Sequence, residues 1–162
     1  MTTTLKSVQP GHWENDFPNV CLFDLITEID TYFTPSLSTQ VNLKEYADKL
    51  RAHATIITVI HEGEIVGLLA AYLNEGKESY ASCACVKPSM RGKGCFSRML
   101  CELIRLAQDM NCTSVACRVN ADDEATLRTY RKNGFTIGSA PLHVHGQQKR
   151  IACWINSKNG NL

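Results

Sequence analysis

The sequence predicts an α/β domain built on a mixed β-sheet. Strand and helix patterns alternate along the 162 residues without an internal repeat or a linker. An early strand–turn–strand pattern predicts an antiparallel hairpin, whereas a later strand–helix–strand pattern predicts a parallel pair with a right-handed crossover. A chain of this size that is 44% hydrophobic and 20% charged can bury one sizeable core. We therefore expect a single domain over residues 1–162.

Two helices are expected before the first hairpin. Apolar residues recur at helical spacing in residues 22–33, and Asn42 with Glu45 three positions later is typical of a capping box at a helix start. The segment TPSLST, residues 34–39, separates these helices because proline and serine favour loops. The two apolar faces consist of Leu22, Leu25, Ile26, Ile29, Phe33, Leu43, Tyr46, Ala47 and Leu50.

Three strands are expected in the middle of the chain. Segments 54–60 and 65–73 are rich in apolar and β-branched residues and flank the short turn HEGE. The segment SYASCACV, residues 79–86, predicts a third strand, which Pro88 ends because proline cannot extend the hydrogen-bonded ladder.

Helix and strand patterns alternate again in the last third of the chain. A helix that Asn111 can terminate is followed by a strand at 114–119. Asp123 can then cap a helix that ends at the Asn-Gly pair 133–134, and RIACWI at 150–155 predicts the last strand. The apolar face of the first of these helices consists of Phe96, Met99, Leu100, Leu103, Ile104 and Ala107.

The charge balance excludes several classes of partner. A formal net charge of +1 gives no general attraction to nucleic acid or to an anionic membrane, so neither partner is expected. Residues 1–13 lack an apolar signal core, and no run approaches the roughly 20 apolar residues of a membrane span. We therefore expect a cytosolic, cytoplasmic protein.

The cysteine and histidine pattern argues against a metal site. The eight cysteines contain no C-x-x-C pair and mostly fall within apolar periodic segments, so we interpret them as reduced core residues. His143 and His145 either ligate a metal or lie hydrogen-bonded at the surface, and the lack of a third ligand nearby favours the surface.

The segment CACVKPSMRGKGCFSRML predicts an anion site. A turn at the carboxyl end of a parallel strand presents free backbone N–H groups and the positive end of the following helix dipole. Gly92 and Gly94 allow unusual backbone conformations and close approach of a ligand, while Arg91 and Lys93 add positive charge. A phosphate or pyrophosphate suits such a turn. A surface turn with two solvated cations is the alternative, and neither a P-loop nor a G-x-G-x-x-G pattern is present.

Two motifs together resemble the GCN5-related N-acetyltransferase (GNAT) family. VKPSMRGKGCF resembles the acyl-CoA loop Q/R-x-x-G-x-G/A, with Arg91 and Gly94 in place, and VNADDEATLRTYRKNGF resembles the family's later strand and capped helix. The resemblance covers about residues 56–135. Phe96 departs from the usual Gly or Ala, although Ser97 supplies a hydroxyl, and Asp123 replaces a common Asn. The second motif is carried by Asn120, Ala125, Tyr130, Gly134 and Phe135.

The resemblance implies a single-domain GNAT fold. Its mixed central sheet contains a parallel βαβ acyl-CoA-binding unit and has helices on both faces. It also implies acetyl-CoA as the acyl donor, with the pantetheine arm pairing along the backbone of the strand before the loop. The implied donor-binding residues are Ala84, Cys85, Val86, Arg91, Gly92, Lys93, Gly94, Cys95, Phe96, Ser97 and Asn120.

The resemblance further implies an N-acetyltransferase that acts by direct attack of an amine in a ternary complex. Tyr130 matches the family tyrosine that protonates the departing CoA thiolate, a role that suits a phenol. A small-molecule acceptor is expected, with an amino sugar as one candidate, and a homodimer is compatible with the sequence. A non-catalytic acyl-CoA-binding or sensor module is the alternative. Candidates for the base are Glu78, Tyr72 and Tyr80, and candidates for acceptor contacts are Asp24, Glu28 and Asp30.

Overall fold

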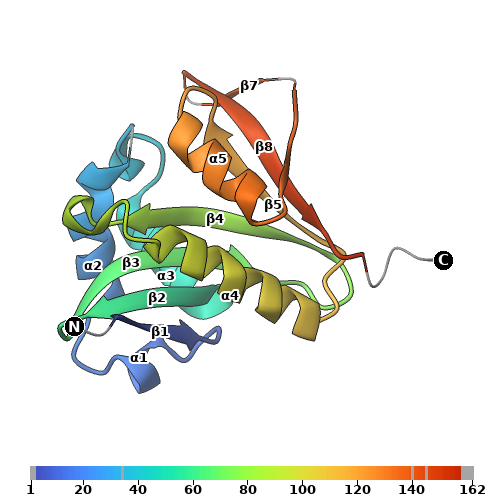
Figure 1. Cartoon of the computed structure of the whole chain (residues 1–162). Helices are drawn as coiled ribbons and strands as arrows, with labels where there is room; N and C mark the ends of the chain where they lie inside the picture. Colours follow the sequence, from blue (N-terminus) through green and yellow to red (C-terminus); the bar gives the residue numbers. More distant parts are fainter. Residues whose placement is uncertain (1–2, 34, 140, 145, 158–162) are drawn as a thin grey trace. The chain divides into compact units, whose positions relative to one another are not determined.

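The computed structural model describes residues 3–33, 35–139, 141–144 and 146–157. They form two compact units (Figure 1). The N-terminal unit comprises Met1–Ala70 and Ala84–Phe96, and the C-terminal unit comprises Ala71–Cys83 and Ser97–Leu162. The single domain expected over 1–162 stays a prediction, and Thr34 of the predicted loop and His145 of the histidine pair lie outside the described residues.

Two strands of the N-terminal unit form the predicted hairpin. Strand β2 (Thr55–His61) is followed by β3 (Glu64–Tyr72) through a turn in which Glu62 and Gly63 have φ of 53° and 76°. Two successive positive φ values are typical of the type I′ turn that joins tight hairpins, so the predicted hairpin is confirmed. Strand β1 (Thr3–Val8), which the sequence analysis missed, pairs antiparallel with β2 from Thr3↔His61 to Val8↔Ile56.

Helices α2 (Leu22–Ile29) and α3 (Leu43–His53) of this unit confirm the two expected helices, and a short α1 (Trp13–Asp16) precedes them. The Asn42 side chain caps α3 by accepting a hydrogen bond of 3.0 Å from the Glu45 backbone N–H. The first helix was expected to reach Phe33, but it ends at Ile29 and tightens into the 3₁₀ turn η1 (Asp30–Tyr32).

The early end of α2 has a local cause. The Asp30 carboxylate accepts hydrogen bonds from the Ser38 backbone N–H (2.8 Å) and hydroxyl (2.7 Å), on a second 3₁₀ turn, η2 (Leu37–Thr39). These bonds tie the predicted loop back onto the end of the helix, so the chain turns before a further α-helical turn can form.

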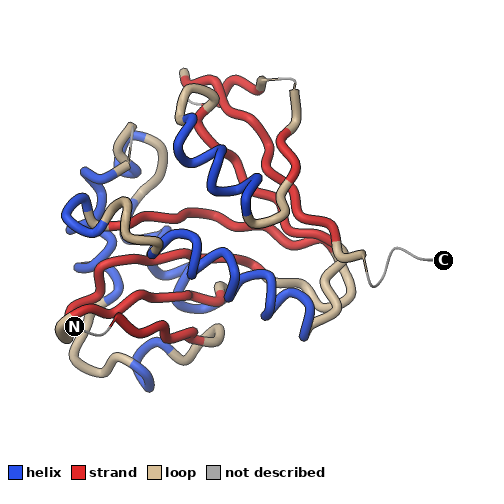
Figure 2. The backbone as a smooth tube through the Cα atoms, in the orientation of Figure 1, coloured by secondary structure: helices blue, strands red, loops and turns tan. Residues whose placement is uncertain are grey.

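The C-terminal unit holds a mixed sheet, as predicted. Strand β4 (Glu78–Val86) begins in this unit and pairs in parallel with β5 (Ser114–Asn120), whereas β5 pairs antiparallel with β8 (Gln147–Ile155). Figure 2 shows β5 and β8 running side by side. The short strands β6 (Thr136–Ile137) and β7 (Leu142–Val144) also pair with β8. The α/β class and the parallel βαβ unit are confirmed.

Helix α4 (Cys95–Asp109) ends where the sequence predicted, and helix α5 (Glu124–Lys132) begins where the sequence predicted. Asn111 adopts a φ of 54°, and the N–H groups of Asn111 and Cys112 donate to carbonyls of the last helical turn, which is a Schellman C-cap. The Asp123 side chain caps α5 by accepting hydrogen bonds from the Thr126 backbone N–H (3.2 Å) and hydroxyl (2.7 Å).

Candidate active site

The glycine loop joins β4 to α4 in the N-terminal unit. A 3₁₀ turn, η3 (Pro88–Met90), leads from the strand into Arg91, and α4 begins at Cys95. Gly92 and Gly94 have φ of 75° and 83°, a region that costs a residue with a Cβ about 1–2 kcal/mol. A Cβ added at either glycine would meet no heavy atom within 4 Å. The backbone conformation therefore calls for glycine, and the space beside the loop is open to a ligand.

Arg91 is held by the backbone carbonyls around it. Its Nε donates to the Val86 carbonyl at 3.0 Å, and its Nη2 donates to the Tyr32 carbonyl at 3.4 Å. The guanidinium thus fastens the loop to the end of β4 and to the turn after α2. The positive charge of Arg91 lies at the loop, as the sequence predicted, and these two hydrogen bonds fix its position. Lys93 is exposed at the other side of Gly92.

The strand before the loop supplies the backbone that was predicted to pair with pantetheine. Ala84, Cys85 and Val86 all lie on β4, and the chain leaves the strand through Lys87, whose backbone N–H donates to the Val66 carbonyl of β3 at 2.8 Å. The parallel ladder of β4 with β5 covers only the rungs from Glu78↔Ser114 to Ala81↔Cys117. The pairing of Ala84–Val86 with pantetheine stays a prediction.

Tyr130 lies on α5 in the C-terminal unit. Only 4% of the residue is exposed, and its ring packs edge-to-face on Phe135 with centroids 5.0 Å apart. Burial raises the pKa of Tyr130 well above its usual value, and the neighbouring Cys117 raises it further. Tyr130 is therefore a protonated hydroxyl at neutral pH, the form that a general acid needs.

Ser97 and Asn120 each have a partner within the C-terminal unit. The Ser97 hydroxyl, on α4, accepts a hydrogen bond of 2.8 Å from Asn133 Nδ2 at the end of α5, which leaves its own hydrogen available to donate. Asn120 Oδ1 accepts a hydrogen bond from Lys149 Nζ on β8. Partial burial lowers the pKa of Lys149. Ser97 therefore lies beside the end of α5, and Asn120 lies beside β8. Neither contact could be predicted from the spacing of residues in the sequence.

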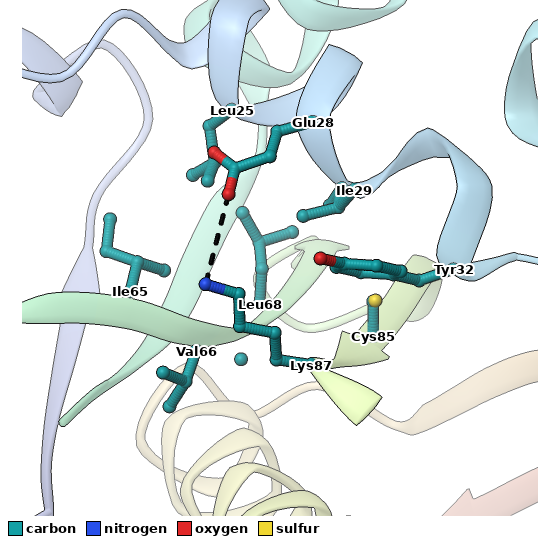
Figure 3. Close-up of a pocket in the computed structure, with 10 residues that line it drawn as sticks. Leu25, Glu28, Ile29, Tyr32, Ile65, Val66, Leu68, Cys85 and Lys87 are labelled. Carbon is teal, nitrogen blue, oxygen red and sulfur yellow. Dashed lines mark ion pairs between the residues drawn. The ribbon is translucent and has the colours of Figure 1, made fainter. Parts of the chain in front are cut away.

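A separate pocket lies in the N-terminal unit between α2, β3 and the end of β4 (Figure 3). Its cavity volume is about 10 Å³, and the empty space between its lining residues is about 280 Å³ when space open to solvent is included. The Tyr32 hydroxyl points into it, and Lys87 Nζ lies 3.9 Å from Glu28 and 2.5 Å from Glu64. The hydrogen bond that Lys87 Nζ donates to the Glu64 carboxylate raises the pKa of Lys87. The lining is formed by Leu25, Glu28, Ile29, Tyr32, Ile65, Val66, Gly67, Leu68, Cys85 and Lys87.

One of the three candidate acceptor contacts lines this pocket. Glu28 lines it, whereas Asp30 is engaged by Ser38 and Asp24 is not part of the lining. The sequence analysis did not single out Lys87 or Tyr32. Lys87 directly follows a buried strand, and that position was the only signal that could have identified it.

The surroundings of the three candidate bases do not favour their accepting a proton from the amine. Burial raises the pKa of Tyr72, which keeps the phenol protonated at neutral pH and unable to accept a proton. Glu78 is exposed at the start of β4, the opposite end of the strand from the glycine loop. Tyr80 is 36% exposed and pairs with Ala116 of β5.

Metal and membrane features were searched over the same described residues. No group of three or more His, Cys, Asp or Glu side chains among them could hold a metal ion. Within those residues, too, every helix is too short or too polar to cross a bilayer.

Comparison with solved structures gives the same fold at low sequence identity. Arabidopsis thaliana NAA60 in complex with acetyl-CoA matches with a TM-score of 0.73 and 13% identity over 95% of this chain and 98% of its own. The ribosomal-protein-S18-alanine N-acetyltransferase of Escherichia coli matches with a TM-score of 0.71 and 16% identity over 99% of both chains. A GNAT family acetyltransferase of Elizabethkingia anophelis with acetyl-CoA bound matches with a TM-score of 0.67 and 16% identity over 95% of this chain and 98% of its own.

Sequence comparison identifies the family directly. No curated protein matches the chain. The family model described as "Acetyltransferase (GNAT) family" matches residues 22–135, which include the glycine loop, β5 and Tyr130. This match covers more than half of the chain and both motifs on which the resemblance rests. The chain therefore belongs to the GNAT acetyltransferase family.

Proposed function

We propose that this protein transfers an acetyl group from acetyl-CoA to an amine of a small molecule by direct attack in a ternary complex. The observation that carries the proposal is the loop before α4, where two glycines in left-handed conformations leave the backbone open to a ligand. Backbone N–H groups at the start of a 15-residue helix favour a pyrophosphate such as that of CoA. Two of the structural neighbours were solved with acetyl-CoA bound.

The donor is held largely by backbone in this proposal. The amides from Arg91 to Phe96 bind the pyrophosphate, and Ser97 adds a hydroxyl that still has a hydrogen to donate. The backbone of Ala84–Val86 pairs with the pantetheine arm, and Asn120 contributes a side-chain amide. An N–H group of this strand also stabilises the negative oxygen of the tetrahedral intermediate.

The reaction needs one proton donor from the protein. The neutral amine attacks the thioester carbonyl, and the C–S bond breaks as the intermediate collapses. Tyr130 gives its phenolic proton to the departing CoA thiolate and then regains a proton from solvent. Its buried and protonated state supports this role. The proton that the amine loses passes to water, because none of the predicted bases has a suitable setting.

The pocket beside α2 is the proposed acceptor site. Most of its lining is apolar, and the Glu28 carboxylate there forms a long ion pair of 3.9 Å with Lys87. A carboxylate beside an apolar wall favours an ammonium group carried on an apolar body. We therefore rank amines with an apolar body ahead of the polyhydroxylated amino sugars.

Thiol release measured with DTNB across a panel of amines, amino sugars and alcohols tests this function. Apolar amines should give CoA release above the acceptor-free rate. Glu28→Gln should lower kcat/KM for the best amine about tenfold, mainly through KM, because it removes the carboxylate that binds the ammonium. Glu75→Gln, in an exposed loop, is the matched control and should leave both constants unchanged. If acetyl-CoA binds but no acceptor releases thiol, the protein is an acyl-CoA-binding sensor instead.

A further inference from the structure

Exposed hydrophobic residues gather on the sheet of the C-terminal unit. In the part of the chain that the structure describes, the large hydrophobic residues that are exposed are Tyr80, Leu142 and Ile155, with exposed fractions of 36%, 42% and 61%. They lie on β4, β7 and β8, respectively. A single exposed apolar residue is ordinary, whereas several on one face are typical of an interaction surface.

The strand register places all three side chains on the same face of this sheet. Residues that share a rung point to the same side, and the side alternates along each strand. Tyr80 pairs with Ala116 of β5, and Ala116 pairs with Cys153 of β8. Ile155 is two positions from Cys153, and the β8 residue that pairs with Leu142 is four positions from Cys153. We call this side the exposed face, and its residues include Glu78, Tyr80, Ala116, Arg118, Leu142, Lys149, Ile151, Cys153 and Ile155.

Helix α5 covers the opposite face of the same sheet. Val115, Cys117 and Val119 alternate with the exposed-face residues of β5 and are at least 95% buried. A Cβ added at Gly134 would lie 4.0 Å from the Trp154 side chain on that opposite face, so the turn after α5 packs against it. Figure 1 shows α5 in front of β5. The residues of the exposed face, in contrast, are all half-buried or exposed.

Opposite charges lie at the two ends of the exposed face. Glu78 shares a rung with Ser114 at the start of β5, whereas Arg118 follows four positions later, and both charged residues are exposed. Four positions along a strand correspond to about 13 Å. The rung of Tyr80 and Ala116 lies midway between these charges. The exposed face thus has an acidic end, an apolar centre and a basic end.

This arrangement of charge is self-complementary. A two-fold axis that crosses the strands at the Tyr80–Ala116 rung exchanges the acidic and basic ends, so Arg118 of each copy comes to the level of Glu78 of the other. Packed sheets lie about 10 Å apart, a gap that the long side chains of arginine and glutamate span from both sides. In the same arrangement the apolar centre packs against its own copy. A two-fold interface requires this property, because one patch serves as both halves.

We propose that the exposed face binds a second copy of this chain to form a two-fold homodimer, in which two Arg118–Glu78 ion pairs flank an apolar centre that contains Tyr80. An unrelated partner would not require the face to complement itself. Burial of the apolar centre supplies the affinity, and the ion pairs fix the orientation of the two copies. The inference does not depend on the proposed reaction, since none of Glu78, Arg118 and Ile155 belongs to the glycine loop or to the pocket beside α2.

Sedimentation velocity over a wide range of protein concentration tests the dimer. The wild type should form a species of twice the chain mass of 18.0 kDa, in a concentration-dependent equilibrium. Ile155→Lys should raise the Kd of the dimer at least about tenfold, because Ile155 lies at the acidic end and its replacement places a cation beside Arg118 of the other copy. Arg128→Glu is the matched control, because Arg128 is exposed on α5 and should leave this Kd unchanged.

Charge reversal tests the ion pairs themselves. Glu78→Arg and Arg118→Glu should each raise the Kd of the dimer at least about tenfold, since either change creates two repulsive pairs. An equimolar mixture of the two variants should form a heterodimer with a Kd within about threefold of the wild-type value, because each ion pair is then restored between different chains. Recovery in the mixture also shows that both variants fold. A wild type that is monomeric at every concentration, a mixture that stays monomeric, or a dimer that Ile155→Lys does not weaken would overturn the proposal.

Discussion

Replacing Gly94 with alanine separates backbone strain from ligand approach. Gly94 and Gly63 have φ of 83° and 76°, and a Cβ at either position meets no heavy atom within 4 Å. Alanine in this region costs about 1–2 kcal/mol, and a protein of this size loses about 2–4 °C in Tm per kcal/mol. Both Gly94→Ala and Gly63→Ala should therefore lower Tm by roughly 2–8 °C in the absence of ligand.

Acetyl-CoA should distinguish the two variants. At about 100 times its Kd a ligand stabilises by about 2.7 kcal/mol, which corresponds to a rise of roughly 5–11 °C in Tm. Differential scanning fluorimetry should show this rise in the wild type and in Gly63→Ala but not in Gly94→Ala, because the added methyl group occupies the space in front of the loop. Gly94→Asn should lose the rise too, although asparagine tolerates left-handed φ better. An equal rise in Gly94→Ala and Gly63→Ala would refute close approach of the ligand to this loop.

Three further predictions concern the C-terminal unit and the cysteines. Tyr130→Phe should lower kcat by about two to four orders of magnitude while the acetyl-CoA shift in Tm persists, and near wild-type kcat would remove Tyr130 from the mechanism. Asp123→Ala should destabilise the protein by about 1 kcal/mol in urea unfolding, because α5 loses its cap to Thr126, and an unchanged midpoint would show that the cap contributes nothing. Cys117 is buried and its pKa is raised to about 12, so it should resist iodoacetamide at neutral pH, whereas the exposed Cys21 should react. Peptide mass mapping would show both outcomes, and rapid labelling of Cys117 would contradict its burial.

Local signals in the sequence predicted helix ends and the hairpin well. The caps at Asn42 and Asp123 and the left-handed Asn111 depend on residues within a few positions of one another, and the structure contains all three. The turn between β2 and β3 likewise depends on the short Glu62–Gly63 pair. Such features are encoded locally, so spacing alone is enough to find them.

Features that depend on distant partners escaped the sequence analysis. Strand β1 has only Val8 buried, so its sequence lacks the apolar alternation that reveals a strand, and it exists because β2 offers it a partner. The contacts of Arg91 with carbonyls of Val86 and Tyr32 join segments up to 59 residues apart. The effect of Cys117 on the pKa of Tyr130 likewise depends on two residues of separate elements, β5 and α5.

The glycine loop could be predicted from the sequence only in part. Its composition alone left a solvated surface turn as an alternative, and only the second motif around Tyr130 favoured the acetyltransferase reading. The structure supplies the physical reason for the glycines at 92 and 94, namely their left-handed conformations. The identity of the acceptor has no comparable local signal, since the pocket that contains Glu28 and Lys87 is assembled from three separate segments.

A rapid-quench experiment under single-turnover conditions tests the central claim most directly. The protein, in excess over acetyl-CoA, is mixed with the best amine of the panel, and free CoA thiol, acetylated amine and protein mass are measured in each quenched sample. Direct transfer predicts that thiol and acetylated amine appear together in equal amounts while the protein mass stays unchanged. Thiol release without acetylated amine, an acetylated protein that forms before the product, or no release with any amine would contradict the proposed reaction.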